Sequence, residues 1–313
     1  MTKKNFIGVG TGLYLLLSIS LLAGCDDGTG ITDESDGRVP LQVSSNIAMR
    51  QQGPRAADNQ WTQNDGIGIY MMPAGEGTIL EETGNRHYKA TGSGENTEFT
   101  PAGDGQAIYF PVNGEEVDFS AYYPYKPLQD DIYTIDLSDQ VDQETIDLMT
   151  AIEANYSKAT PEVFFQFKRR LSKIVLSVAA GTGIADADLE NLKVEISGQH
   201  TAGTYEPLSR DFDILQENPE IIVLKTTTDG TDAEAILMPN DVGGNDPVEG
   251  RRLIFTLENT GDVFRWDIPG DKYFNQGEKN MYRITINRTG LEVTSSITDW
   301  VIGNGDGEDG SAE

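Results

Sequence analysis

Cysteine, histidine and long apolar runs are scarce in this chain of 313 residues. The one cysteine, Cys25, excludes an internal disulfide and a zinc site built on thiolates, so stability has to come from packing. The two histidines, His87 and His200, stand in polar, turn-rich surroundings, and we expect both at the surface. The apolar run of residues 13–22 is shorter than the roughly 20 residues of a transmembrane helix.

Motifs of catalysis and phosphate binding are also missing. The sequence contains no G-x-S-x-G segment, and no glycine-rich loop that carries a lysine and opens a helix. Acids at positions 136, 139 and 142 miss the alternating spacing of an EF-hand calcium loop. With 51 acidic residues, no carboxylate pair stands out as that of a glycosidase. We therefore assign no catalytic, cofactor-binding or metal-binding residue, and we expect that the protein is not an enzyme.

Acidic residues outnumber basic ones by 51 to 23, which gives a formal net charge of -28. A surface of this sign repels nucleic acid and anionic lipid headgroups. We therefore expect no nucleic-acid partner, and attachment to a membrane has to come from something other than surface charge.

The N-terminus has the order of a bacterial export signal. Lys3 and Lys4 precede the apolar run, and Leu22-Ala23-Gly24-Cys25 resembles the lipobox of lipoproteins. This resemblance implies that residues 1–24 are a lipoprotein signal peptide and that Cys25 carries fatty acid such as palmitate. An ordinary signal peptide or a buried free thiol remain as alternatives. Residues 25–38 are acidic and glycine-rich, which predicts a flexible tether.

The remaining pattern is almost entirely that of β-strands. Apolar residues alternate with polar ones in four segments, and clusters of glycine, proline and asparagine separate them. These segments contain Val117 to Tyr123, Ile174 to Val178, Leu253 to Leu257 and Tyr282 to Ile286. One segment, Asp142 to Ala154, has helical spacing. The length predicts two domains, which we place at residues 39–160 and 161–302 as β-sandwiches, with a disordered tail at 303–313.

Several passages, in the right order along the chain, resemble the fimbrillin-like lipoproteins of Bacteroidetes, the FimA and Mfa family of type V pilus subunits. The resemblance departs at Lys168, where members often carry histidine, so we assign that position no function. The passages that carry the resemblance are Arg55-Ala56, Trp61 to Tyr70, Ile108 to Pro111, Val117 to Tyr125, Phe165 to Ile174 and Ile297 to Trp300.

This resemblance implies an all-β fold of two tandem transthyretin-like β-sandwiches and a structural or adhesive role in a pilus (fimbria). It implies a lipid-anchored, surface-exposed protein of the cell outer membrane, where Asp26 and Asp27 fit an export signal. Other pilus subunits would be partners by β-strand exchange, with a host or bacterial surface ligand for adhesion.

Leu41, Val43 and Ser45 alternate with Gln42 and Ser44, which predicts a first strand. By the resemblance, cleavage after Arg55 or Arg50 would remove this strand, and a neighbour's segment from Leu291 to Ile302 would replace it.

Two other functions remain open. A surface glycan-binding lipoprotein would use an exposed aromatic platform, for which Trp266 is the candidate. A secreted hydrolase is disfavoured by the lack of a suitably placed histidine.

Overall fold

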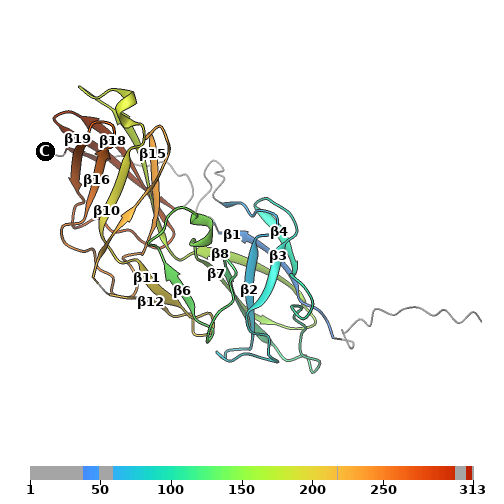
Figure 1. Ribbon diagram of the computed structural model, residues 1–313. Coiled ribbons are helices and arrows are strands. Elements are labelled where there is room, and N and C mark those ends of the chain that lie inside the picture. Colours follow the sequence, from blue (N-terminus) through green and yellow to red (C-terminus); the bar gives the residue numbers. More distant parts are fainter. Residues whose placement is uncertain (1–37, 49–58, 217, 300–307, 312–313) are drawn as a thin grey trace, which may run out of the picture. The chain divides into compact units, whose positions relative to one another are not determined.

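The computed structural model describes residues 38–48, 59–216, 218–299 and 308–311 (Figure 1). These residues form β-strands and two short 3-10 helices, η2 (Gln143–Thr145) and η3 (Asp186–Leu189). The fold is all-β, as predicted. In the part of the chain that the structure describes, no helix is long and apolar enough to cross a membrane.

The N-terminal strands close into a barrel in the order β1-β4-β3-β2-β5-β7-β8. Side chains that point inward build one apolar core around Trp61, whose ring meets the rings of Phe99, Tyr123 and Phe167 edge-on. Alternation is regular in β8, where every second residue from Val163 to Phe167 is buried. The strands are β1 (Gln42–Ile47), β2 (Gly66–Pro73), β3 (Arg86–Ala90), β4 (Asn96–Pro101), β5 (Val117–Tyr123), β7 (Met149–Tyr156) and β8 (Glu162–Arg169).

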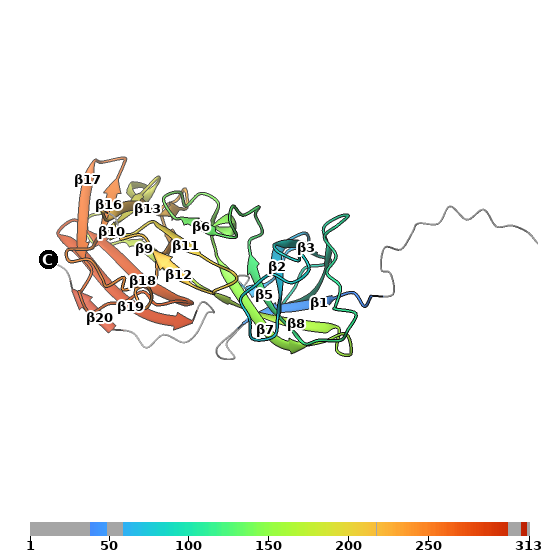
Figure 2. The same cartoon turned by 90° about the horizontal axis from the view of Figure 1, so that it is seen from below.

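The C-terminal strands form two sheets that share a second core (Figure 2). One sheet has the order β13-β10-β16-β17 and the other β14-β15-β9-β18-β19-β20. Their bounds are β9 (Ser172–Ala180), β10 (Lys193–Gln199), β13 (Glu220–Val223), β14 (Lys225–Thr226), β15 (Asp232–Leu237), β16 (Arg252–Leu257), β17 (Asp262–Asp267), β18 (Glu278–Asn287), β19 (Gly290–Asp299) and β20 (Glu308–Ser311). The predicted strands in β9, β16 and β18 are confirmed, because their apolar alternate residues are buried.

A third sheet joins strands from distant parts of the sequence. Its order is β12 (Phe212–Ile214), β11 (Ala202–Tyr205) and β6 (Tyr133–Asp136), so a strand from the N-terminal half pairs with one from the C-terminal half. A third core cluster includes buried residues of all three strands and also Tyr70 and Tyr122. The outer face of β5 is therefore covered, and our expectation of a strand with one buried face is wrong there: Asp118, Ser120 and Tyr122 are buried as well.

The predicted helix at 142–154 is also wrong. The chain forms only η2 there and then continues as β7, which pairs with β5 from Val117 to Tyr123. This ladder supplies backbone hydrogen bonds and burial that an isolated helix of this length lacks. Ile152, which completed the helical spacing, is 43% exposed.

Sheet membership differs from the predicted boundaries at two places. β8 hydrogen-bonds to β1 and β7, so the chain leaves the first barrel after Arg169 and not at residue 160. The segment 303–313, expected to be a disordered tail, contains β20, which pairs antiparallel with β19.

Candidate functional site

The site that the resemblance points to is the place of β1 in the barrel. β1 runs antiparallel to β4 and parallel to β8, so it is hydrogen-bonded on both sides (Figure 1). Its ends are held as well: the Leu41 N–H donates to the Ile108 carbonyl at 2.9 Å, and the Ala48 N–H donates to the Phe167 carbonyl at 2.6 Å. Removal of this strand would leave unpaired backbone groups on both neighbours.

The inward side of β1 contributes to the barrel core. Leu41, Val43 and Ile47 belong to the core cluster and are 5 to 6% exposed. Val43 lies opposite Phe99 of β4 and Val163 of β8, so its departure would uncover apolar side chains on both sides. The remaining inward residue is Ser45, which is fully buried. A groove with two free backbone edges and an apolar floor is the geometry that accepts an added strand.

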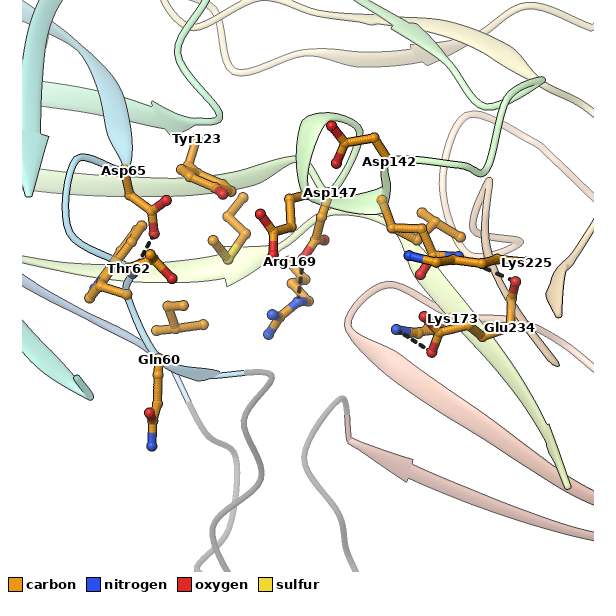
Figure 3. A pocket seen from close by; sticks show the side chains of 16 residues that line it. Gln60, Thr62, Asp65, Tyr123, Asp142, Asp147, Arg169, Lys173, Lys225 and Glu234 are labelled. Atoms are coloured by element: carbon orange, nitrogen blue, oxygen red, sulfur yellow. Dashed lines mark hydrogen bonds and ion pairs between the residues drawn. The ribbon is translucent and has the colours of Figure 1, made fainter. Parts of the chain in front are cut away.

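A cavity of about 500 Å³ lies at the C-terminal end of β1 and includes Ile47 in its lining (Figure 3). Two ion pairs form between residues that line it. The Arg169 Nε donates to Asp147 at 2.8 Å, with both side chains largely buried, and the Lys173 ammonium lies 2.8 Å from Glu234. These pairs account for four of the eight charged side chains that line the cavity.

Asp65 lines the same cavity and accepts the Thr62 N–H at 2.7 Å. Burial raises the pKa of the Asp65 carboxyl above its ordinary value, and the nearby Glu144 adds to the effect, although the hydrogen bond from Thr62 opposes it. Burial also raises the pKa of Tyr123, and the neighbouring carboxylates, Asp65 first among them, add to this rise.

The two histidines do not form a catalytic arrangement. The His87 ring stacks on Tyr125 with centroids 3.7 Å apart, and burial together with Lys89 lowers the pKa of His87. His200 is 9% exposed, so the expectation of a surface position is wrong for it. It lies in the short connection between β10 and β11, where the expected turn does not form, and His87 belongs to β3 rather than to a turn. Within the described ranges, no group of three or more metal-ligating side chains comes together.

The predicted processing and lipidation sites, Cys25, Arg50 and Arg55, lie outside the described residues. In the sequence, both arginines fall between the end of β1 and Asn59. The predicted donor segment is described as far as Asp299. Along β19 it pairs with β18, and its Leu291 and Val293 are buried in the C-terminal core.

The tryptophan named for the glycan alternative is not freely displayed. Trp266 packs partly against the C-terminal core, with its ring 5.3 Å from that of Tyr282. The alternation of Leu41, Val43 and Ser45 predicted the side of the first strand that is buried, and all three residues are buried. Sequence reasoning missed the ion pairs at the cavity, because they join residues far apart in the sequence.

Comparison with known proteins agrees with this architecture. The profile of the fimbrillin-like family matches residues 54–300. The chain is 41% identical over 308 residues to a Bacteroides uniformis protein named as a proposed fimbrium subunit, Fim1C, covering 95% of this chain and 97% of the other. A crystal structure of a proposed cell adhesion protein from the same species superposes with a TM-score of 0.73 at 38% identity, covering 85% and 99%.

A second crystal structure, from Bacteroides ovatus, has a TM-score of 0.66 at 21% identity, covers 85% of this chain and 99% of its own, and supports the fold. The chain belongs to the fimbrillin-like family. Membership supports a pilus subunit or adhesin at the cell surface that associates with other pilus subunits, and it brings no positive sign of enzymatic activity.

Proposed function

We propose that this protein is a structural or adhesive pilus subunit that assembles by strand complementation after proteolytic removal of β1. The observation that carries the proposal is the position of β1: it closes the barrel between β4 and β8 and precedes both candidate cleavage sites, Arg50 and Arg55. A cut after either arginine separates β1 from the rest of the chain without touching another strand.

The uncut strand should block assembly. While β1 is covalently attached, it competes for the groove at high effective concentration, so a strand from another molecule cannot displace it. After the cut, β1 is held by non-covalent contacts alone: its two ladders, the hydrogen bonds at its ends and its inward side chains. Cleavage thus converts a closed monomer into one whose groove can exchange its occupant.

The donor would be a neighbour's C-terminal segment within Leu291 to Ile302. Because β19 pairs with β18 along Gly290–Asp299, a donor from this region has to leave its own sheet. β20 pairs with the other edge of β19 along Glu308–Ser311 and would have to separate as well. Donation therefore breaks two ladders of β19, and the two ladders that the donor gains in the acceptor's groove would have to replace them.

The protein would reach its place as a lipoprotein. Acylation of the Cys25 sulfur, followed by removal of residues 1–24, would anchor the protein in the outer membrane, and several acyl chains together would hold it firmly. Replacement of Cys25 by serine should abolish incorporation of labelled fatty acid and release the protein from membranes. Protease treatment of intact cells, with and without Asp26→Ala and Asp27→Ala, tests surface exposure. Full protection of the unmodified protein would place it on the periplasmic side of the outer membrane.

Limited trypsin treatment of the chain from residue 25, carrying Cys25→Ser, tests the assembly mechanism. Light scattering should show growth of oligomers after the cut, and Arg50→Ala with Arg55→Ala should stay monomeric with an unchanged fold. Cleavage at either arginine without growth, or equal growth of the double variant, would remove strand exchange from this proposal and leave a lipid-anchored surface sandwich.

A further inference from the structure

The inward row of β1 contains one polar residue at its centre. Ser45 has an exposed fraction of 0%, and it stands between Val43 and Ile47, which are both in the apolar core. In register it lies beside Thr97 of β4 and Phe165 of β8. Among the described residues, the Ser45 hydroxyl has no hydrogen-bond partner. Its outward neighbour Ser44 is only half-buried and has access to solvent.

A buried hydroxyl without a partner weakens the hold of its strand. When β1 lies in the groove, the Ser45 hydroxyl gives up its hydrogen bonds to water and receives none in return. When β1 leaves, those bonds are recovered. β1 pairs with β8 along its whole length and with β4 from Val43 to Asn46, so the backbone at Ser45 is paired on both sides. Among the described side chains of β1, the Asn46 Oδ1 also lacks a partner, but Asn46 points outward and Ser45 is the one that faces the core.

We propose that Ser45 weakens the binding of β1 in its groove, so that another strand can replace β1 after cleavage. The position that Ser45 fills would then select the incoming strand, because it favours a small apolar side chain such as alanine or valine. The proposal rests on the proposed strand exchange. It names the chemistry of the preferred partner: a β-strand of another pilus subunit with apolar residues at all inward positions. Such a strand fills the same floor without burying an unsatisfied hydroxyl. It would bind more tightly than the Leu291 to Ile302 segment of a second copy, because that segment carries Ser295 in its alternating row.

The magnitude follows from the cost of an unsatisfied buried polar group. Removal of the Ser45 hydroxyl should slow the release of β1 by roughly fivefold or more. The cost of burying an unsatisfied hydroxyl corresponds to about five- to 100-fold in the equilibrium constant for dissociation of β1. Alanine is the sharpest replacement because it removes the hydroxyl and adds no volume. The matched control is Ser44→Ala, which removes the same group from the neighbouring outward position.

Release of β1 can be measured without assembly. The isotope-labelled chain from residue 25, carrying Cys25→Ser, is cut with trypsin and mixed with excess unlabelled synthetic peptide of residues 39–50. Mass spectrometry of the protein fraction then follows loss of the labelled fragment. We expect Ser45→Ala to release its fragment at least about fivefold more slowly than the unmodified chain, and Ser44→Ala within about twofold of it. Competing peptides should rank with alanine or valine at position 45 above serine.

The two hypotheses fail in different ways. Release at the unmodified rate or faster in Ser45→Ala, or retention of β1 in the unmodified chain for days, would overturn the role of Ser45. Urea unfolding of the uncut variant checks its fold, because a stability at or above that of the unmodified chain is expected. If fragments exchange as expected and yet no oligomers grow, the specificity of the groove stands and the proposed assembly fails.

Discussion

Two strands in this molecule occupy equivalent places with opposite construction. β1 in the barrel and β9 in the C-terminal sheets are each flanked by one antiparallel and one parallel neighbour. β1 has 6 residues, and β9 has 9. At the centre of β9 the inward residues Ile174, Leu176 and Val178 are apolar, whereas the centre of β1 carries Ser45. β9 also has a buried serine, Ser172 at its start, but its hydroxyl donates to the Glu278 carbonyl at 3.3 Å, whereas the Ser45 hydroxyl has no partner among the described residues.

The difference fits the proposal that β1 is replaceable, while β9, in a similar arrangement of neighbours, is permanent. β9 continues directly from β8 and pairs with β18 from Lys173 to Ala180, so nothing frees it short of unfolding. β1 is short, carries a polar defect and is followed by two candidate cleavage sites. A short ladder and a polar residue in the inward row weaken the binding of a strand without altering the sheet around it.

The largest expected effect comes from the core of the permanent strand. Leu176→Ala should lower the free energy of unfolding by about 3 to 4 kcal/mol, because a fully buried leucine leaves a cavity. Val43→Ala should lower it by about 2 kcal/mol in the uncut chain. After the cut and loss of β1, the Leu176 effect should persist and the Val43 effect should vanish. Urea unfolding of both forms measures this.

An exposed isoleucine gives the control for these two variants. Ile221 is 54% exposed, so Ile221→Ala should change the free energy of unfolding by less than about 0.5 kcal/mol in either form. If Val43→Ala kept its full cost after cleavage, β1 would still occupy the groove, and the contrast between the two strands would be wrong.

A smaller effect is expected at the ion pair that supports β8, the parallel neighbour of β1. Arg169 is the last residue of β8, and its side chain and that of Asp147 are only 7% and 12% exposed. Arg169→Met should cost about 3 kcal/mol, because it leaves a largely buried carboxylate without its arginine. Urea unfolding, with thermal unfolding as a second measurement, would detect this loss.

The matched control is an exposed ion pair on the C-terminal sheet. Arg252 and Asp267 lie 3.2 Å apart with side chains 40% and 75% exposed, so Arg252→Met should cost less than about 0.5 kcal/mol. Equal costs for both variants would mean that the pair at Arg169 contributes no more than a surface contact, and that β8 does not depend on it when β1 leaves.

The sequence predicted strands well where side-chain alternation alone decides their burial. β9, β16 and β18 follow the period of two because each has one face on the core. It failed where a partner distant in sequence decides. Both faces of β5 are buried because the third core covers the outer one, and residues 149–154 became a strand because β5 was available to pair with them.

The candidate site was predictable to a similar degree. The first strand and its inward Leu41 and Val43 follow from local alternation and from the resemblance, and the structure places both residues in the core. The burial of His200 and the pairing of Arg169 with Asp147 depend on how separate segments pack, which local patterns do not encode. The position of the first strand was therefore predictable from the sequence, whereas the side chains that surround it could be identified only from the structure.

The smallest expected effect concerns the cavity that β1 and β9 both line, through Ile47 and Lys173. Lys173 is paired with Glu234 there, whereas the pKa of Asp65, the residue before β2, is raised by burial and by Glu144. An unfolded aspartate has a pKa of about 3.9. Because the folded state holds the Asp65 proton more tightly, stability should fall as the pH rises above this value and level off beyond the raised pKa.

Asp65→Asn should remove this decline, while its side-chain oxygen can still accept the Thr62 N–H. Because the carboxyl is only about half buried, solvent screening should keep the effect well below about 1 kcal/mol. Urea unfolding at pH 4 and pH 7 would show it as a difference between the unmodified chain and the variant that grows with pH. Asp104→Asn, at an exposed position, is the control and should follow the unmodified chain. If the free energies of unfolding of the variant and the unmodified chain differ by the same amount at both pH values, then folding does not change the pKa of Asp65, and this side of the cavity is as insensitive to pH as we expect the exposed Asp104 to be.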